Sequence, residues 1–195
     1  MYMRIGTVKR DTKETQITIS IDLDGGGANR IRTGVGFFDH MLTALAVHSG
    51  IDMDIEVEGD LQVDCHHTIE DTGIALGMAF AKALGDKAGI CRYGSMFIPM
   101  DESLALVSLD ISGRPYLVFD CPFVSDRMGE MDTQMVEEFF RAFAFHAGIT
   151  LHAKLMYGSN DHHKTEALFK ALAHSLKQAV TPTKSEIPLS TKGVL

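Results

Sequence analysis

The chain has 195 residues, of which 45% are hydrophobic and 23% charged, as in a globular protein with a sizeable core. Its formal net charge of −8 argues against a nucleic-acid or anionic-membrane partner, because both need clustered Lys and Arg. No apolar run is long enough for a transmembrane helix, and residues 1–4 lack the start of a secretory signal. The widely spaced Cys65, Cys91 and Cys121 predict free thiols in the cytoplasm.

The first half of the chain combines strand and helix patterns. Alternating apolar residues predict strands at residues 16–24 and 51–57, and apolar stripes at helical spacing predict helices at 37–48 and 68–84. Gly50 is typical of a residue that ends a helix.

The second half repeats this order. The same patterns predict strands at residues 104–110 and 151–157 and helices at 136–145 and 164–180. Residues 181–195 show no periodicity and predict a C-terminal substrate-binding arm.

The repeat extends to individual residues. The segment ALAVHSGI at 44–51 aligns with AFAFHAGI at 142–149, 98 positions later, and HHTIE at 66–70 aligns with HHKTE at 162–166, 96 positions later. We therefore expect an internal duplication of a unit of about 90 residues, forming one α+β body with helices on one face of a mixed sheet. The repeat halves would be residues 1–92 and 93–180. Two independent domains are the alternative, but no linker separates the halves.

The repeated motif HHxxE carries the chemistry. Residues three apart share a helix face, so His67 and Glu70 are predicted to bind one metal ion together. His66 points about 100° away and can bind a different ion. Imidazole and carboxylate suit Mn, Fe, Co, Ni or Zn. One such motif is weak evidence, since a histidine pair at a helix start is often a cap or a surface pair, but two matching copies predict a two-metal site.

Each motif needs further ligands, and the duplication suggests them. His40 aligns with Glu138, and both lie on the first predicted helix of their half. A core or capping role for His40 and a solvated helix face for Glu138 are the alternatives. The predicted sets are His40, His67, Glu70 and His162 for one ion and Glu138, His163, Glu166 and His66 for the other. Positions left open on each ion would take substrate or water.

The remaining candidates carry weaker signals. His48 and His146 are expected at helix C-termini, where capping is the alternative to a functional role. Cys65 is a soft ligand or, as we favour, a support for its neighbour. His152 and His174 follow no pattern and are taken as structural.

A few basic residues are candidates for binding an anion. Arg92, Arg114 and Lys170 stand near turns or on the motif helix, where a surface charge is the alternative. The tail segment Ser190-Thr191-Lys192-Gly193 offers hydroxyls, amides and an ammonium group, which suit a phosphate. The sequence contains no nucleotide-binding glycine motif.

Longer segments resemble a known family. They are FFDHML (37–42), DCHHTIEDTGIALG (64–77), RYGS (92–95), PMDESLALVSLDISGRP (99–115), HHKTEALFKALA (162–173) and STKGVL (190–195). Together they closely resemble imidazoleglycerol-phosphate dehydratases of histidine biosynthesis, over essentially the whole chain.

The resemblance implies a hydro-lyase with two Mn²⁺ per active site, in a homo-oligomeric shell of twenty-four subunits that share their sites. It implies that the metal ligands are His40, His66, His67, Glu70, Glu138, His162, His163 and Glu166. Some relatives carry His at the position of Glu138, which keeps a metal-binding side chain. The resemblance also implies catalytic roles for Glu14 and His48, beside the substrate. It assigns the phosphate to Arg92, Arg114, Lys170, Ser190 and Lys192.

The implied reaction converts D-erythro-imidazoleglycerol phosphate to imidazole-acetol phosphate. A ring bound by both ions as imidazolate would expel the neighbouring hydroxyl, giving a diazafulvene-like intermediate, and loss of a proton would then give the enol. Glu14 is the expected proton carrier, and its duplication partner Glu102 is expected to be structural. A two-metal phosphoester hydrolase and a non-catalytic metal-storing shell are the alternatives.

Overall fold

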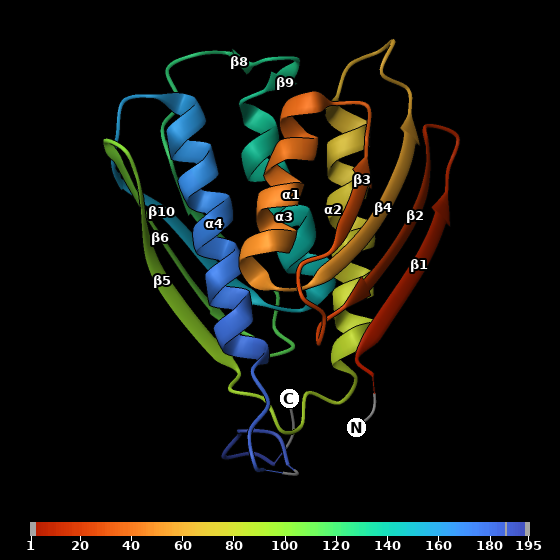
Figure 1. Ribbon diagram of the computed structural model, residues 1–195, viewed down its shortest axis with the longest axis vertical. Helices are drawn as coiled ribbons and strands as arrows, with labels where there is room; N and C mark the ends of the chain where they lie inside the picture. Colours follow the sequence, from red (N-terminus) through yellow and green to blue (C-terminus); the bar gives the residue numbers. More distant parts are fainter. Residues whose placement is uncertain (1–2, 186, 194–195) are drawn as a thin grey trace.

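In the computed structural model, which describes residues 3–185 and 187–193, four α-helices lie between two four-stranded sheets (Figure 1). Residues 186, 194 and 195 of the predicted arm lie outside the described residues. None of the helices in the described part combines the length and apolarity needed to cross a membrane.

The first group of elements runs to residue 84. Its members are β1 (Ile5–Asp11), β2 (Thr15–Asp22), β3 (Asn29–Arg32), α1 (Gly36–Ser49), β4 (Asp52–Gly59) and α2 (His66–Leu84). The second group has the same order with an added hairpin. Its members are β5 (Tyr93–Met100), β6 (Ser103–Asp110), β7 (Tyr116–Asp120), β8 (Arg127–Met128), β9 (Met131–Asp132), α3 (Gln134–Ala147), β10 (Thr150–Tyr157) and α4 (Asp161–Val180).

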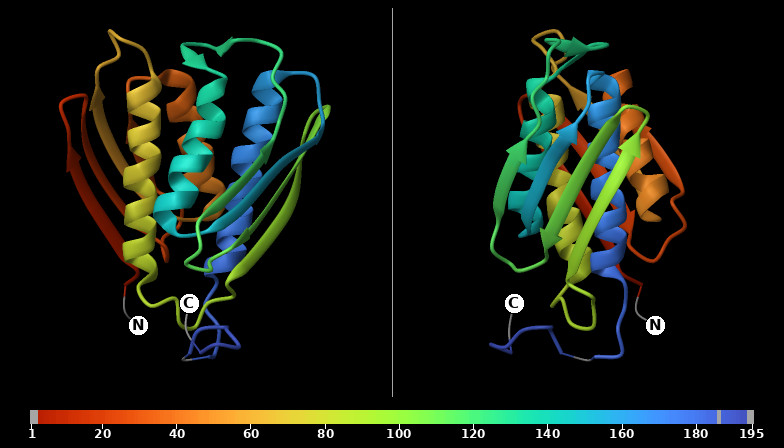
Figure 2. Two further views of the ribbon diagram at one scale, coloured as in Figure 1. Left: turned by 180° about the vertical axis from the view of Figure 1, so that it is seen from behind. Right: turned by 90° about the vertical axis from the view of Figure 1, so that its left-hand side faces the viewer.

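The two four-stranded sheets share one topology. Their strand orders are β1-β2-β4-β3 and β5-β6-β10-β7, and each ends in a parallel pair, β3 with β4 and β7 with β10. The sequence pattern predicted one mixed sheet, whereas each group builds its own. Helices α1 and α2 cover the first sheet, and α3 and α4 cover the second, so the helices form the middle of the molecule (Figures 1 and 2).

The expected elements are present, and their bounds matter for the site. In β2, Ile17, Ile19 and Ile21 are buried and the residues between them are not, as the alternation predicted. Gly50 ends α1 with φ 75° and donates its N–H to the carbonyl of Ala46, which confirms the predicted cap. Helices α2 and α4 begin two and three residues earlier than expected, so both HHxxE motifs lie wholly within helices.

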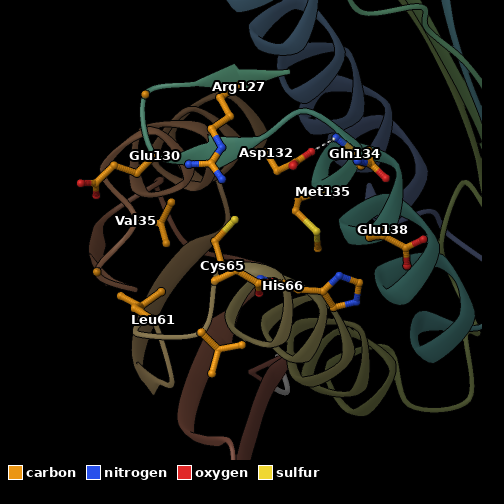
Figure 3. Close-up of a pocket in the computed structure, with 14 residues that line it drawn as sticks. Val35, Leu61, Cys65, His66, Arg127, Glu130, Asp132, Gln134, Met135 and Glu138 are labelled. Carbon is orange, nitrogen blue, oxygen red and sulfur yellow. Dashed lines mark hydrogen bonds between the residues drawn. The ribbon is translucent and has the colours of Figure 1, made fainter. Parts of the chain in front are cut away.

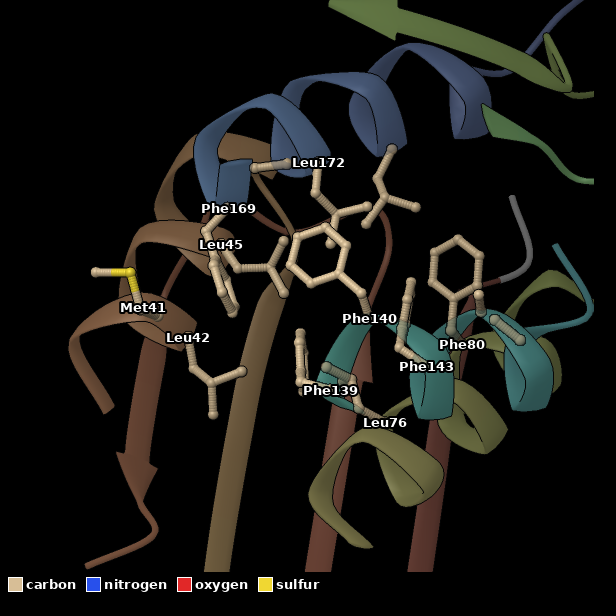
Figure 4. Close-up of a cluster of buried hydrophobic side chains, with 14 of the residues drawn as sticks. Met41, Leu42, Leu45, Leu76, Phe80, Phe139, Phe140, Phe143, Phe169 and Leu172 are labelled. Atoms are coloured by element: carbon tan, nitrogen blue, oxygen red, sulfur yellow. The ribbon is translucent and has the colours of Figure 1, made fainter. Parts of the chain in front are cut away.

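Aromatic rings fill the space between the helices (Figure 4). Phe139 of α3 stacks on Phe169 of α4 with ring centroids 5.2 Å apart, and Phe38 of α1 meets Phe139 edge to face at 5.3 Å. Phe80 of α2 meets Phe143 of α3 at 5.6 Å. These buried rings join helices of both groups, so the two groups share one core.

Glycines let α2 and α3 approach closely. A Cβ added at Gly77 of α2 would lie 2.7 Å from the carbonyl oxygen of Phe143 and 2.9 Å from the backbone N of Ala147. A Cβ at Gly73 would meet the side chain of Ala142 at 2.9 Å. The backbones of α2 and α3 are therefore nearly in contact along these turns.

Gly77→Ala should push α2 away from α3. We expect the variant to lose roughly 1–2 kcal/mol of unfolding free energy, because overpacking outweighs the better helix propensity of Ala. Gly26→Ala is the matched control, since nothing lies within 4 Å of its added Cβ. Urea unfolding of the metal-free protein measures both, and equal midpoints for the two variants would contradict the expectation.

Candidate metal and substrate site

The amino-terminal ends of the helices lie at the same end of the molecule (Figure 1). All the predicted metal ligands lie in the first two turns of these helices. They are His40 on α1, His66, His67 and Glu70 on α2, Glu138 on α3, and His162, His163 and Glu166 on α4. The fold thus collects side chains that are up to 126 positions apart in the sequence.

A first cluster consists of His40, His162 and Glu166. Their ligand atoms all lie within 4.8 Å of one another. His162 Nε2 is 3.3 Å and His40 Nε2 is 3.7 Å from the same Oε2 of Glu166, while Lys170 Nζ lies 2.7 Å from Oε1. Burial opposes ionisation of Glu166, but the hydrogen bond and charge of Lys170 keep its pKa below the ordinary value. Two imidazoles therefore face a carboxylate, an arrangement suited to a divalent ion.

A second cluster consists of His66, Glu70 and Glu138. His66 Nε2 lies 3.5 Å from Glu70 Oε2, which repeats the pairing of His162 with Glu166. Arg141 donates from Nη2 to Glu70 Oε1 at 3.1 Å and from Nε to Glu138 Oε2 at 3.0 Å. These contacts raise the pKa of Arg141. No sequence motif marks Arg141, because its contact with Glu70 joins two helices.

The pairing within each motif differs from the expectation. The sequence analysis paired His67 with Glu70, at a spacing of three, but the structure places His66 beside Glu70, at a spacing of four. In an α-helix, residues four apart are offset by a smaller angle than residues three apart, and α2 already begins at His66. The sequence also predicted His40 beside Glu70, but within one chain His40 lies beside Glu166.

The second histidine of each motif contacts a different carboxylate. Asp60 lies 3.0 Å from His67 Nδ1, and Glu102 lies 2.7 Å from His163 Nδ1. These hydrogen bonds raise the pKa of both imidazoles. A carboxylate on Nδ1 orients the ring and leaves Nε2 as the nitrogen that faces outward, as in many metal-binding histidines. Asp60 is a further residue that the sequence analysis missed.

Glu14 and Glu102 occupy equivalent places but differ in surroundings. Glu102 accepts from the backbone N–H groups of Asn160 at 2.8 Å and Ser159 at 3.1 Å, and these bonds with His163 hold its pKa well below the usual range. Glu14 is 53% exposed and lies 3.8 Å from His67 Nε2. Glu14 is therefore the more exposed carboxylate of the pair.

His48 lies in the last turn of α1, next to α4. Its ring centroid is 5.4 Å from that of His174. Burial lowers the pKa of His48, and the charges of Lys170 and His174 lower it further. The imidazole of His48 is therefore biased toward its neutral form, in which one nitrogen can accept a hydrogen bond.

The predicted phosphate ligands divide between two places. Arg92, Arg114 and the tail residues Ser190, Thr191 and Lys192 line a cavity of about 720 Å³, whereas Lys170 lies beside Glu166 in the first cluster.

Arg92 also binds the tail segment that lines this cavity. It donates to Asp110 at 2.6 and 3.0 Å, which raises its pKa, and to the carbonyl of Leu189 at 2.5 Å. Arg92 therefore anchors the tail as well.

The tail cavity and the first cluster lie at opposite ends of α4. The N–H of Arg92 bonds the carbonyl of Ala179 near the end of α4, whereas His162 lies at its start. The intervening 17 residues of helix correspond to about 26 Å. A small molecule cannot span this distance, so one chain does not bring these two groups of residues together.

A cavity of about 690 Å³ opens beside the second cluster (Figure 3). It lies between the starts of α2 and α3 and the hairpin β8–β9. His66 and Glu138 reach its wall, together with Cys65 and Arg127 (Figure 3). The second cluster is thus accessible from this cavity.

Comparisons with known proteins agree along the whole chain. The model of the family "Imidazoleglycerol-phosphate dehydratase" matches residues 33–176. A protein of that name from Clostridium botulinum strain Hall is 59% identical, with 100% of both chains covered. One from Ruminiclostridium cellulolyticum is also 59% identical, with 99% of this chain and 100% of the relative covered.

Solved structures agree as well. The crystal structure of imidazoleglycerol-phosphate dehydratase from Staphylococcus aureus superposes with a TM-score of 0.84 at 45% identity, covering 92% of this chain and 99% of the other. That of IGPD from Pyrococcus furiosus gives 0.83 at 40% identity, covering 96% and 100%.

The depressed pKa of Glu102 predicts a pH-dependent contribution to stability. A carboxylate whose folded-state pKa lies below its ordinary value of 4.5 stabilises the fold above pH 4.5, and loses this effect as the pH falls further. Urea midpoints of the wild type and Glu102→Gln should therefore differ at pH 7 and converge below pH 4.5. Glu56→Gln, on an exposed strand residue, controls for loss of one charge. A difference for Glu102→Gln that stays constant with pH would refute the expectation.

Proposed function

The chain belongs to the imidazoleglycerol-phosphate dehydratase family, whose members are hydro-lyases of histidine biosynthesis, and from this premise we propose that it dehydrates D-erythro-imidazoleglycerol phosphate with two bound Mn²⁺ ions. The observation that carries the proposal is the pairing of each motif's first histidine and glutamate at the same end of the helical layer. The family model and the relatives confirm the family that the sequence motifs indicated.

The residues present fit divalent metal ions. The first cluster already brings two imidazoles and a carboxylate within 4.8 Å, and the Nδ1 atoms of His67 and His163 are held by carboxylates. The ions would be held by His40, His66, His67, Glu70, Glu138, His162, His163 and Glu166. Two bound ions would supply the positive charge that stabilises the substrate's imidazole ring in its deprotonated form.

The chain's own groups would then move the protons. Glu14, beside His67, would take the proton from the carbon next to the one that loses its hydroxyl. His48, biased toward its neutral form, would accept a hydrogen bond from the substrate. Arg92, Arg114 and the tail residues Ser190–Lys192 would bind the phosphate, with Lys170 contributing from α4.

A complete site would need two chains. About 26 Å of helix separates His162 from the tail cavity, so the metal end of one subunit would meet the phosphate end of another. The outer face of the second sheet offers an apolar surface for association, through the exposed Tyr93, Phe97 and Tyr116. We propose a homo-oligomer with shared sites, and the twenty-four-subunit shell suggested by the family resemblance.

The organisation of the chain follows from the same elements. Sheets of one topology in both groups support an internal duplication, with halves at residues 1–92 and 93–180 and a substrate-binding arm at 181–195. The free thiols of Cys65, Cys91 and Cys121 support a cytoplasmic location.

His163→Ala should abolish turnover. We expect ketone formation from imidazoleglycerol phosphate, in Mn²⁺-reconstituted protein, to fall more than about hundredfold, since a ligand and its orientation by Glu102 are both lost. His146→Ala, at the far end of α3, should retain activity. Free phosphate is measured in the same tube, because its release would favour the phosphoester-hydrolase hypothesis over the dehydratase. A fully active His163→Ala would overturn the site assignment, and metal binding without any product would favour a non-catalytic shell.

Mixing two inactive variants tests the sharing of sites. His163→Ala damages the metal end, and Arg114→Ala damages the phosphate end at a residue whose side chain is 65% exposed. Each alone should be inactive. Subunits refolded together should regain activity at up to about a quarter of the sites, because random mixing pairs an intact metal end with an intact phosphate end that often. No recovery in verified mixed oligomers would show that each site comes from one chain.

A further inference from the structure

The two clusters share a pairing of histidine, glutamate and cation, although among the described residues only the first brings three ligand atoms within 4.8 Å of one another. In the first cluster, Oε2 of Glu166 faces the histidines while Lys170 takes Oε1. In the second cluster, Oε2 of Glu70 faces His66 while Arg141 takes Oε1. In both clusters one carboxylate oxygen is therefore left facing an imidazole.

The clusters differ in charge. Glu138 stands in the second cluster where His40 stands in the first, so the second cluster brings two carboxylates together. Arg141 bonds both of them, and it is the group that offsets their repulsion.

Arg141 contacts the oxygens that a metal ion would approach. Its Nε and Nη2 both reach Oε2 of Glu138, and Nη2 also reaches Glu70 on the other helix. A guanidinium and a divalent ion that share two carboxylates repel each other. A bound ion in the second cluster therefore has to displace Arg141 or bind beside it at an electrostatic cost.

We propose that Arg141 is a positioning residue that serves as the built-in counter-cation of the second cluster, holding Glu70 and Glu138 together without metal and weakening divalent-ion binding there. The inference rests on the proposed function, because it assigns the second cluster to a metal ion. The alternative is a surface ion pair that ties α2 to α3 and has no effect on the metal. The alternative predicts no gain in metal affinity when Arg141 is removed.

The test is Mn²⁺ binding to Arg141→Gln, measured by calorimetric titration of metal-free protein and by the electron paramagnetic resonance signal of free Mn²⁺. We expect binding about tenfold tighter in one class of site, since the removed charge lies within hydrogen-bond distance of two ligands. The unfolding temperature of the metal-free protein should fall, because the carboxylates then repel each other. Unchanged or weaker Mn²⁺ binding by Arg141→Gln would overturn the proposal.

Two further variants sharpen the test. Arg141→Lys keeps the charge and should bind Mn²⁺ nearly as the wild type does. Arg30→Gln removes an exposed arginine that is likewise paired to a carboxylate, Asp54, and should change nothing. In a Glu138→His background only one carboxylate remains, so Arg141→Gln should have a smaller effect. If Arg141→Gln changed Mn²⁺ affinity equally in the wild type and in the Glu138→His background, the proposed bridging of Glu70 and Glu138 by Arg141 would be contradicted.

The outcome also separates this inference from the proposed function. Wild-type protein that binds no Mn²⁺ would refute the two-metal site itself. Wild-type protein that binds Mn²⁺ and forms the ketone, with Arg141→Gln of unchanged affinity, would refute only the role of Arg141.

Discussion

The edge-to-face contacts of Phe38 with Phe139 and of Phe80 with Phe143 fix how the two halves of the molecule meet. Each ligand cluster takes side chains from both halves. The first cluster combines His40 of the first half with α4 of the second, and the second cluster combines Glu138 of the second half with α2 of the first. Neither half alone can therefore form a cluster. The aromatic core between the helices is thus a condition for bringing the predicted metal ligands together as well as for stability.

The sequence predicted most of the elements but not all of them. The central strands and all the helices carry a clear apolar period, which comes from burial of one face, and these elements are present. The four edge strands β1, β3, β5 and β7 were not predicted, because they bury few apolar side chains and no clear alternation marks them. The hairpin β8–β9, with two residues in each strand, was missed as well. Such elements depend on pairing with neighbours that are distant in sequence.

Within the site, the sequence identified the residue types better than their partners. The repeated motif showed which side chains are metal-binding candidates, but not that His66, four residues before Glu70, lies beside it in place of His67. Arg141 and Asp60 were missed for a related reason, since their importance lies in contacts across the fold. Glu14 and Glu102 align in the repeat, but this alignment does not predict how different their surroundings are. The backbone N–H groups before α4 bind Glu102, whereas Glu14 remains exposed.

The bond from Arg92 to the tail has a consequence for sequence variation. Arg92 holds the tail through the main-chain carbonyl of Leu189, not through the leucine side chain. Any residue at 189 can supply that carbonyl, so substitutions there leave the attachment intact. Asp110, in contrast, fixes the guanidinium through two hydrogen bonds that depend on its carboxylate. The arm can thus accept new side chains while its point of attachment to the sheet stays the same.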